Sequence, residues 1–326
     1  MISQGEILRT SIGIIGLSII LFIYIRIAKK LDFTIQLKNS KKNIILGAGI
    51  IFPLSYSYSL LFFETFPFYL SIIVFLLMII SFIDDLKSIN VLFRLSIQIL
   101  CVSVTIFLFY ENLLTSIYLS CIIVLIYVGY INSFNFMDGI NGMLASYTFI
   151  TILALLVVNN IVPYMSSSIL GLLLFSTFLF LIGNFKKKPF FISGDVGSIC
   201  LGYIIGFIIL KFYLTEANPM IFLLIVIYLI DTGITMCINI VNKQNILKAH
   251  REHLYEKLVF IKNIPDLKVS LAYSIIQILI SVIVIYSIYN QINSIMFFIV
   301  IALCLVLFYV IFRALIFGNE FKQTKY

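Results

Sequence analysis

Residues 70–83 read LSIIVFLLMIISFI, and two aspartates, Asp84 and Asp85, follow directly. The stretch Ile221–Ile230 is apolar in the same continuous way. Strands of an outer-membrane barrel would alternate polar and apolar side chains, and neither stretch does so. Both are therefore predicted to be membrane-spanning helices, and they decide the fold class of the whole chain.

The composition extends this prediction to the rest of the chain. Of the 326 residues, 62% are hydrophobic and 11% are charged, and the mean hydropathy is +1.15. These values indicate a polytopic integral membrane protein, a single transmembrane domain over residues 1–326 with no room for a soluble domain. We expect an all-α fold with about 11 transmembrane helices of roughly 20 residues each. The predicted spans are 7–27, 44–62, 68–83, 95–110, 116–131, 142–158, 166–183, 199–214, 220–239, 271–288 and 295–312.

The positive charges predict how the chain is oriented. Basic residues follow the first apolar run instead of preceding it, so this run is a permanent helix and not a signal peptide. With the N-terminus outside and the C-terminus cytoplasmic, the cytoplasmic side holds all 22 Lys and Arg residues except Arg9 and Lys211. The cytoplasmic segments are 28–43, 84–94, 132–141, 184–198, 240–270 and the C-terminal tail.

The other polar groups gather at the same face. The net charge of +8 reflects orientation and attraction to anionic membrane lipids or phosphorylated substrates, and nucleic acid is not expected as a partner. Only Asp231 lies well inside an apolar run. A transporter would place ionisable groups near the midplane, so the pattern favours chemistry at one membrane face. The five cysteines have no paired spacing and are expected to be buried, inert thiols.

The most polar short stretch is Asn132–Met143, with apolar runs on both sides. Asn132, Asn135 and Asp138 are spaced i, i+3, i+6, so on a helix they lie toward one side. Gly139 and Gly142 let another backbone or a ligand come close. Burying such groups without partners would cost several kcal/mol each. The stretch is either a polar loop that caps a helix or part of a functional site.

Two acidic motifs point to a cation and a phosphate. Asp84 and Asp85 repel each other when ionised, which favours a neighbouring metal ion or the Lys87 ammonium; a solvated helix end is the alternative. Asp195 lies in Phe191–Ser198, between glycines and just before an apolar run. Backbone amides at a helix start can bind phosphate oxygens, and Asp195 is placed to hold Mg²⁺.

Residues 249–257 contain the only two histidines of the chain, His250 and His253, with Arg251 between them. On a helix the two imidazoles share a face. Guanidinium forks suit phosphate oxygens, so these three residues are predicted to bind a diphosphate. A zinc site would need further ligands nearby, and none is evident.

Four motifs together suggest a family. They are Asp-Asp-Leu-Lys (84–87), Asn-x-x-Asn-x-x-Asp-Gly-Ile-Asn-Gly (132–142), Gly-Asp-Val-Gly-Ser-x-x-Leu-Gly (194–202) and His-Arg-Glu-His-Leu-Tyr (250–255). In this order and spacing they resemble the polyprenyl-phosphate N-acetylhexosamine-1-phosphate transferases, the MraY- and WecA-like glycosyltransferase family 4. The histidine motif resembles the branch that initiates O-antigen, capsule or teichoic-acid glycans, and not the peptidoglycan branch.

The resemblance implies an enzyme of the bacterial inner membrane, with its active site at the cytoplasmic face. It would transfer a sugar-1-phosphate from a UDP-sugar to undecaprenyl phosphate and release UMP. By matching position, Asn135 and Asp195 would ligate Mg²⁺, with Mn²⁺ as the alternative ion. The acidic residues Asp84, Asp85 and Asp138 would serve catalysis. Substrates would be bound by Asn132, Lys87, His250, Arg251 and His253.

The chain also departs from the family pattern. Many members carry Asp where this chain has Asn141, and the first cytoplasmic loop lacks the usual His and Arg before Gly47 and Gly49. A catalytically inactive homologue that acts as a scaffold is therefore one alternative, and a lipid or sugar transporter is another. The sugar, the downstream glycan and the oligomeric state, a homodimer included, stay open.

Overall fold

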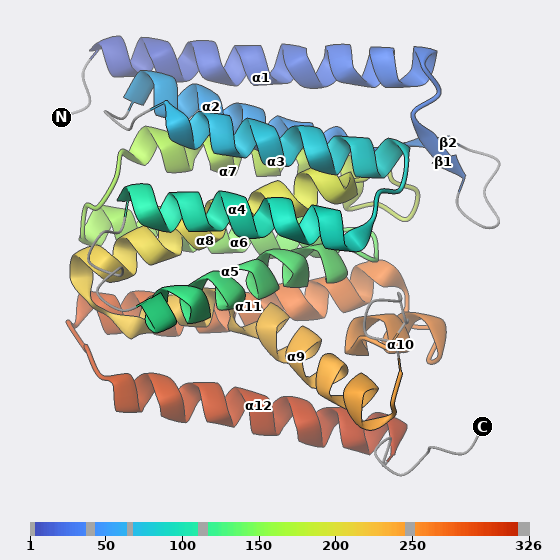
Figure 1. The fold of residues 1–326 in the computed structure, drawn as a ribbon, viewed down its shortest axis with the longest axis vertical. Coiled ribbons are helices and arrows are strands. Elements are labelled where there is room, and N and C mark those ends of the chain that lie inside the picture. The colour runs from blue at the N-terminus through green and yellow to red at the C-terminus, as the bar shows by residue number, and fades with distance from the viewer. Residues whose placement is uncertain (1–3, 37–42, 64–67, 110–116, 245–251, 319–326) are drawn as a thin grey trace.

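The computed structural model describes residues 4–36, 43–63, 68–109, 117–244 and 252–318. The chain forms a bundle of long helices that lie side by side, with α9 crossing the others obliquely (Figure 1). Within these residues ten helical segments are long and apolar enough to span a membrane. They are α1 (Gln4–Lys30), α3 (Tyr69–Leu86), α4 (Val91–Phe109), α5 (Ile117–Phe136), α6 (Met143–Ile161), α7 (Ser167–Asn184), α8 (Gly194–Glu216), η3 (Pro219–Ile225) continuing into α9 (Val226–Val241), α11 (Asp266–Tyr289) and α12 (Ile295–Phe317).

The fold class is confirmed: this is an all-α polytopic membrane protein. The second predicted span, 44–62, differs from expectation. It begins as strand β2 (Asn43–Ile45), paired with β1 (Thr34–Gln36), and continues through η1 (Ala48–Ile50) into α2 (Ile51–Phe63). The apolar helical part, Ala48–Phe63, is shorter than a spanning helix of about 20 residues. The short helix α10 (Leu254–Phe260) lies in the predicted loop 240–270.

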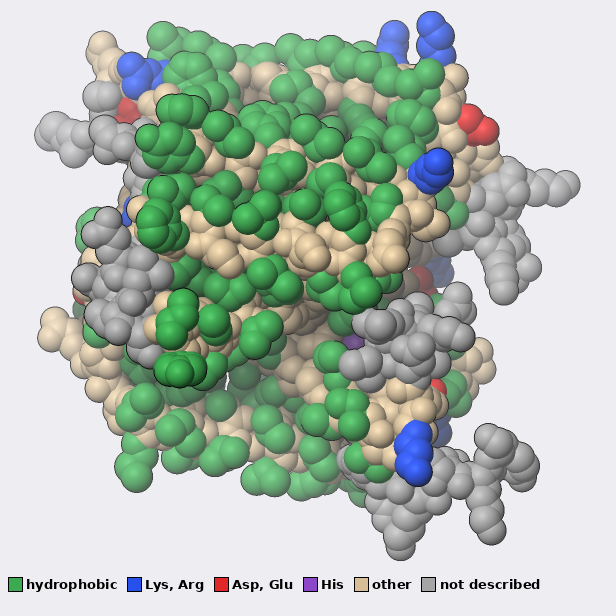
Figure 2. Space-filling model, in the orientation of Figure 1, with side chains coloured by type: hydrophobic (Ala, Val, Ile, Leu, Met, Phe, Trp, Pro, Cys, Tyr) green, Lys and Arg blue, Asp and Glu red, His purple; other side chains and the backbone are tan. Residues whose placement is uncertain are grey.

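The surface matches a lipid environment. In Figure 2 hydrophobic side chains cover most of the visible face, and the visible Lys and Arg side chains lie toward its ends. Helices α1 and α12 form two opposite edges of the bundle (Figure 1). On α12 only Tyr309 and Arg313 are buried. Because lipid tails are as apolar as leucine, an outer helix of this kind needs few protein contacts.

Helix α8 forms the centre of the bundle, and glycines let it approach α5 closely. A Cβ at Gly202 would lie 3.1 Å from the Ile131 Cα, and one at Gly206 would collide with the Tyr127 ring. The Tyr127 hydroxyl in turn donates to the Tyr203 carbonyl at 2.6 Å. Small residues at a helix contact are the usual way for membrane helices to pack tightly. This contact holds the C-terminal end of α5 beside the first half of α8.

Polar side chains join the second half of the bundle. Gln277 of α11 donates to Thr151 of α6 at 3.0 Å and to the Leu224 carbonyl at 2.7 Å. Leu224 lies in η3, where 3₁₀ geometry leaves carbonyls without the usual helical partner. Tyr147 also donates to this carbonyl, at 2.9 Å. Satisfying a broken helix from neighbouring side chains is what allows the break inside a membrane.

The β1–β2 ribbon ties the first segment to the start of α8. Ile45 forms a parallel bridge with Phe191, and Gly49 N–H donates to the Ser193 carbonyl at 3.1 Å. A Cβ on Gly49 would collide with the Gly197 backbone. Gly49 is therefore needed for close backbone contact with the Gly-Asp-Val-Gly-Ser motif.

The expectation of buried cysteines is wrong for three of the five. Cys101 and Cys200 are buried, whereas Cys121, Cys237 and Cys304 are exposed, and all five are free thiols. The apolar run surrounding each cysteine predicted burial, but a membrane helix is apolar on its outward face as well. These three thiols therefore lie on outward helix faces.

The predicted orientation can be tested with exposed positions at both ends. In a background without native cysteines, Lys188→Cys and Asn263→Cys should be shielded from an impermeant thiol reagent in intact cells, while Asn290→Cys should react. Lys188 and Asn263 follow the cytoplasmic ends of helices in this orientation, and Asn290 lies in the external turn between α11 and α12. The reverse pattern of labelling would overturn the orientation.

Candidate active site

The start of α8 is capped by a carboxylate from another helix. Asp85, at the end of α3, accepts from the backbone N–H of Asp195 at 2.8 Å and from that of Val196 at 3.1 Å. The first amides of a helix have no partner within the helix, and the positive end of the helix dipole favours an anion there. Gly194 has φ +70, and a Cβ at this position would collide with Asp85. Glycine is therefore required where the two motifs meet.

A guanidinium that the sequence analysis did not single out bridges the acidic motifs. Arg94, at the start of α4, places Nη1 2.7 Å from Asp84 Oδ2 and 2.5 Å from Asp195 Oδ2. Asp84 also accepts from the Ile89 N–H at 2.8 Å. Arg94 counted only toward topology in the sequence, although its position directly before the predicted span 95–110 was a signal. It balances charge between carboxylates that lie far apart in the chain.

The end of α5 lies against the start of α8 through two serines. Ser198 Oγ donates to Asn135 Oδ1 at 2.9 Å, and Ser193 Oγ donates to Asp138 Oδ2. Burial of the Asp138 carboxyl is the main cause that raises its pKa to about 8. The hydrogen bond from Ser193 acts in the opposite direction, and the charges of Asp195 and Asp85 add to the increase.

Asn184 fixes the two motif loops relative to each other. Its Oδ1 accepts from the Gly142 N–H at 2.9 Å, and its Nδ2 donates to the Phe191 carbonyl at 3.1 Å. Gly142 has φ +83, and a Cβ there would collide with the ring of Phe185. The loop after α5 and the loop before α8 thus share one buried amide as a common support.

The histidine motif reaches this site through α10. The His253 ring stacks between the Phe136 and Tyr255 rings, with centroids 5.9 Å apart in each pair. Tyr255 Oη donates to the Phe136 carbonyl at 2.6 Å, and a Cβ on Gly139 would collide with the Tyr255 hydroxyl. His253 therefore lies beside the end of α5. The predicted residues His250 and Arg251 lie outside the described part of the chain.

Two predicted substrate-binding residues stand apart from the cluster. Asn132 is buried, and its Nδ2 donates to Gln98 Oε1 at 2.6 Å and to the Val128 carbonyl at 2.8 Å, joining α4 to α5. Lys87 is exposed just past the end of α3. The structure thus brings together Asp84, Asp85, Asn135, Asp138 and Asp195, with Arg94 added. His253 lies next to this cluster, against Phe136.

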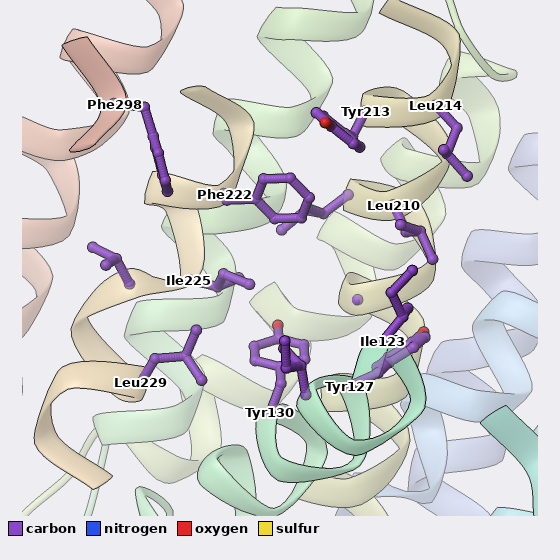
Figure 3. A pocket seen from close by; sticks show the side chains of 14 residues that line it. Ile123, Tyr127, Tyr130, Leu210, Tyr213, Leu214, Phe222, Ile225, Leu229 and Phe298 are labelled. Atoms are coloured by element: carbon purple, nitrogen blue, oxygen red, sulfur yellow. The ribbon is translucent and has the colours of Figure 1, made fainter. Parts of the chain in front are cut away.

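An apolar groove of about 350 Å³ runs along the bundle between α5, α8, η3, α9 and α12. In Figure 3 Tyr127 and Tyr130 of α5 lie on the opposite side of the groove from Ile225 and Leu229. Every side chain that lines it is hydrophobic or aromatic, and Ile126 is largely exposed. A groove of this composition suits hydrocarbon. The lining residues are Ile123, Ile126, Tyr127, Tyr130, Gly206, Ile209, Leu210, Tyr213, Leu214, Phe222, Ile225, Val226, Leu229 and Phe298.

The donor atoms at the site suit a hard cation. Four aspartates, Asp84, Asp85, Asp138 and Asp195, lie in this cluster, and the Arg94 guanidinium pairs with two of them, Asp84 and Asp195. Among the described residues no group of three or more His, Cys, Asp or Glu side chains is arranged to hold a metal ion. Mg²⁺ often binds through one or two carboxylates and completes its shell with water and substrate phosphates. The Asp195 carboxylate and the Asn135 amide oxygen fit that kind of site.

Residues 67–213 match the model of glycosyl transferase family 4. This stretch is similar to that family. The matched residues include three of the four motifs and end before the histidine motif. A search of curated proteins found no match to the chain.

The raised pKa of Asp138 predicts a pH-dependent stability. Between about pH 4 and 8 the folded carboxyl holds a proton that the unfolded one has released, so raising the pH destabilises the fold by at most about 1.4 kcal/mol per unit. The loss levels off above the folded pKa of about 8. Melting temperatures in detergent with chelator should fall less steeply with pH for Asp138→Asn than for the wild type. Parallel curves would contradict the assignment.

Proposed function

We propose that the whole chain is a member of glycosyltransferase family 4 and transfers an N-acetylhexosamine-1-phosphate from a UDP-sugar to undecaprenyl phosphate, releasing UMP. This reaction would initiate a surface glycan of the O-antigen, capsule or teichoic-acid type at the cytoplasmic face of the bacterial inner membrane. One observation carries the proposal: carboxylates from three motifs that lie far apart in sequence meet at one end of an apolar bundle, where Arg94 pairs with Asp84 and Asp195 and Ser193 binds Asp138.

The reaction exchanges one phosphoanhydride for another. An oxygen of the lipid phosphate attacks the phosphorus that carries the sugar, the anhydride bond to UMP breaks, and UMP leaves with its electron pair. A phosphomonoester with a second pKa near 6 is already largely dianionic at neutral pH, so the nucleophile needs little activation. The protein must mainly hold two anionic substrates in line and neutralise their charge.

Each residue of the cluster has a role that suits its surroundings. Asp195 and Asn135 would hold Mg²⁺, which supplies charge neutralisation between the phosphates when it is bound. Both oxygens of Asp85 are occupied by α8 amides, so this residue supports the site. Asp84 and Arg94 are then the groups that we place beside the lipid phosphate, with the guanidinium as the phosphate ligand.

Asp138 and the histidine motif are assigned to the nucleotide-sugar. Asp138 lies between the metal-binding pair and α10, where a protonated carboxyl can donate to a phosphate or sugar oxygen. His253 stacks on the Phe136 ring, and with His250 and Arg251 it would bind the diphosphate. Asn132 and Lys87 are proposed to support and attract the substrates, respectively, from the edge of the cluster.

The apolar groove offers a place for the lipid. Part of a polyprenyl chain would lie against Tyr127, Tyr130 and Phe222. A chain seated there could keep its phosphate at the membrane surface, where the carboxylate cluster lies. Burial of each methylene from water would contribute about 0.8 kcal/mol, although exchange with bilayer lipid contributes less.

The direct test is an assay with purified protein in detergent. Undecaprenyl phosphate, Mg²⁺ and each of several UDP-sugars should yield UMP with at least one sugar, and the lipid product should carry a diphosphate-linked sugar. UMP release without lipid acceptor would indicate hydrolysis. No UMP from any UDP-sugar, with protein that is folded and monodisperse, would refute the proposed function.

Loss of the metal-binding residues should abolish most activity. Asp195→Asn and Asn135→Ala should each lower kcat by about 10²–10³-fold or more, because each removes an electrostatic stabiliser of the reacting phosphates. Both variants should also need more Mg²⁺ for half-maximal rate. Asn141→Asp is the matched control in the same sequence motif as Asn135, and its rate should stay near that of the wild type. Near-normal rates in the first two variants would exclude the assignment.

Filling the groove should weaken lipid binding alone. Ile123→Trp projects a large ring into it and should raise the KM for polyprenyl phosphate by about tenfold, while the KM for the UDP-sugar stays unchanged. Ile122→Trp, the neighbouring and more exposed position on α5, is the control. Equal effects of the two substitutions would show that the groove does not hold the lipid.

A further inference from the structure

Asp231 is the one acidic side chain that sequence analysis placed inside an apolar run, and the proposed reaction does not use it. It lies on α9 and is fully buried. Its Oδ1 is 3.1 Å from His253 Nδ1 and accepts from the Leu254 N–H at 3.3 Å. Its Oδ2 accepts from the Tyr273 hydroxyl at 2.6 Å. The Asp231 carboxylate is thus fully buried and has three polar partners, as buried polar groups in folded proteins usually do.

The contact between Asp231 Oδ1 and His253 Nδ1 restricts which nitrogen of the imidazole carries a proton. An ionised carboxylate has only acceptor sites, so the ring nitrogen that faces Asp231 in that state is a donor. In this form Nδ1 of His253 bonds to Asp231 and not to the Glu256 N–H, with which the ring forms the capping box of α10. Nε2 is then the nitrogen left for a ligand, and the partner of the first nitrogen decides the state of the second.

The backbone on both sides of His253 is held as well. Leu254 N–H bonds to Asp231, and the carbonyl of Glu252 accepts from Arg313 Nη2 of α12 at 2.8 Å. Arg313 is buried and also donates to Thr235 of α9 at 3.1 Å. The side chain of Glu252 pairs with Lys257 at 2.6 Å. Helices α9, α10 and α12 thus hold the segment around His253. Helix α12 is the least buried of the candidate membrane spans.

We infer that Asp231 is a positioning residue, which holds His253 with the proton on Nδ1 and leaves Nε2 for the diphosphate of the nucleotide-sugar. The inference rests on the proposed function for the identity of the ligand. The position of the imidazole beside Asp231 does not depend on the proposed function. Asp231 touches no substrate in this account and acts only through His253.

The proton position can be observed directly, because the chain has two histidines. In the His250→Gln variant, labelled with ¹⁵N-histidine and placed in lipid bilayers, only His253 contributes imidazole signals. Solid-state NMR should show a protonated Nδ1. Asp231→Asn in this background should populate the form protonated on Nε2, since the amide can donate to Nδ1. An unprotonated Nδ1 in the His250→Gln protein would overturn the inference, even if the Asn variant fails to fold.

Kinetics in the otherwise wild-type protein provide the second measurement. Asp231→Asn should raise the KM for the UDP-sugar at least tenfold and change the KM for polyprenyl phosphate less than twofold. Tyr273→Phe is the matched control, because it removes another hydrogen bond from Asp231 and leaves the contact with His253. Its kinetics should resemble the wild type.

The outcomes separate the two proposals. Equal losses in Asp231→Asn and Tyr273→Phe, or equal effects on both substrates, would make Asp231 a structural residue and refute the inference. A wild-type protein that releases no UMP from any UDP-sugar refutes the proposed function. The NMR measurement then still decides whether Asp231 sets the proton position of His253.

Discussion

The cap that Asp85 places on the start of α8 is the interaction on which the site depends. It joins two of the sequence motifs and holds the amides that would otherwise be unpaired at a helix end near the membrane surface. Because α8 is also the most buried helix, its start is a fixed reference for everything around it. Asn135 and Asp138 meet it through serines, and Arg94 meets it through Asp195.

Most of the fold follows from hydropathy. Apolar runs predicted the helices, because a backbone buried in lipid must satisfy its own hydrogen bonds. The short α2 was harder to foresee, because the run that contains it is partly a strand whose partner, Phe191, lies far along the chain. The helices also extend past the predicted spans: Asn135 sits in the last turn of α5 and not in a loop. Polar side chains near a helix end lower hydropathy without ending the helix.

The candidate site was only partly predictable. Spacing within a motif indicated which residues share a face, but partners from distant helices could not be read from it. Arg94 shows this limit, because one basic residue near a helix end is typical of orientation signals. Asn132 shows the same limit in another way. Its spacing with Asn135 was helical as expected, yet its amide bonds to Gln98 on α4 and not to a residue of the site. Asp231 was noticed for its unusual place, and only the fold supplied its partner, His253.

The bond from Arg313 to Glu252 has a consequence for biogenesis. Membrane proteins are synthesised from the N-terminus, so α12 leaves the ribosome after the helices that carry the carboxylate cluster. Until it inserts, the Glu252 carbonyl lacks its Arg313 donor, and the support for the histidine motif is incomplete. The nascent chain can therefore assemble the carboxylate cluster of α3, α5 and α8 well before the histidine motif is locked in place. Chains truncated before α12 would carry the acidic half of the site without a secured histidine.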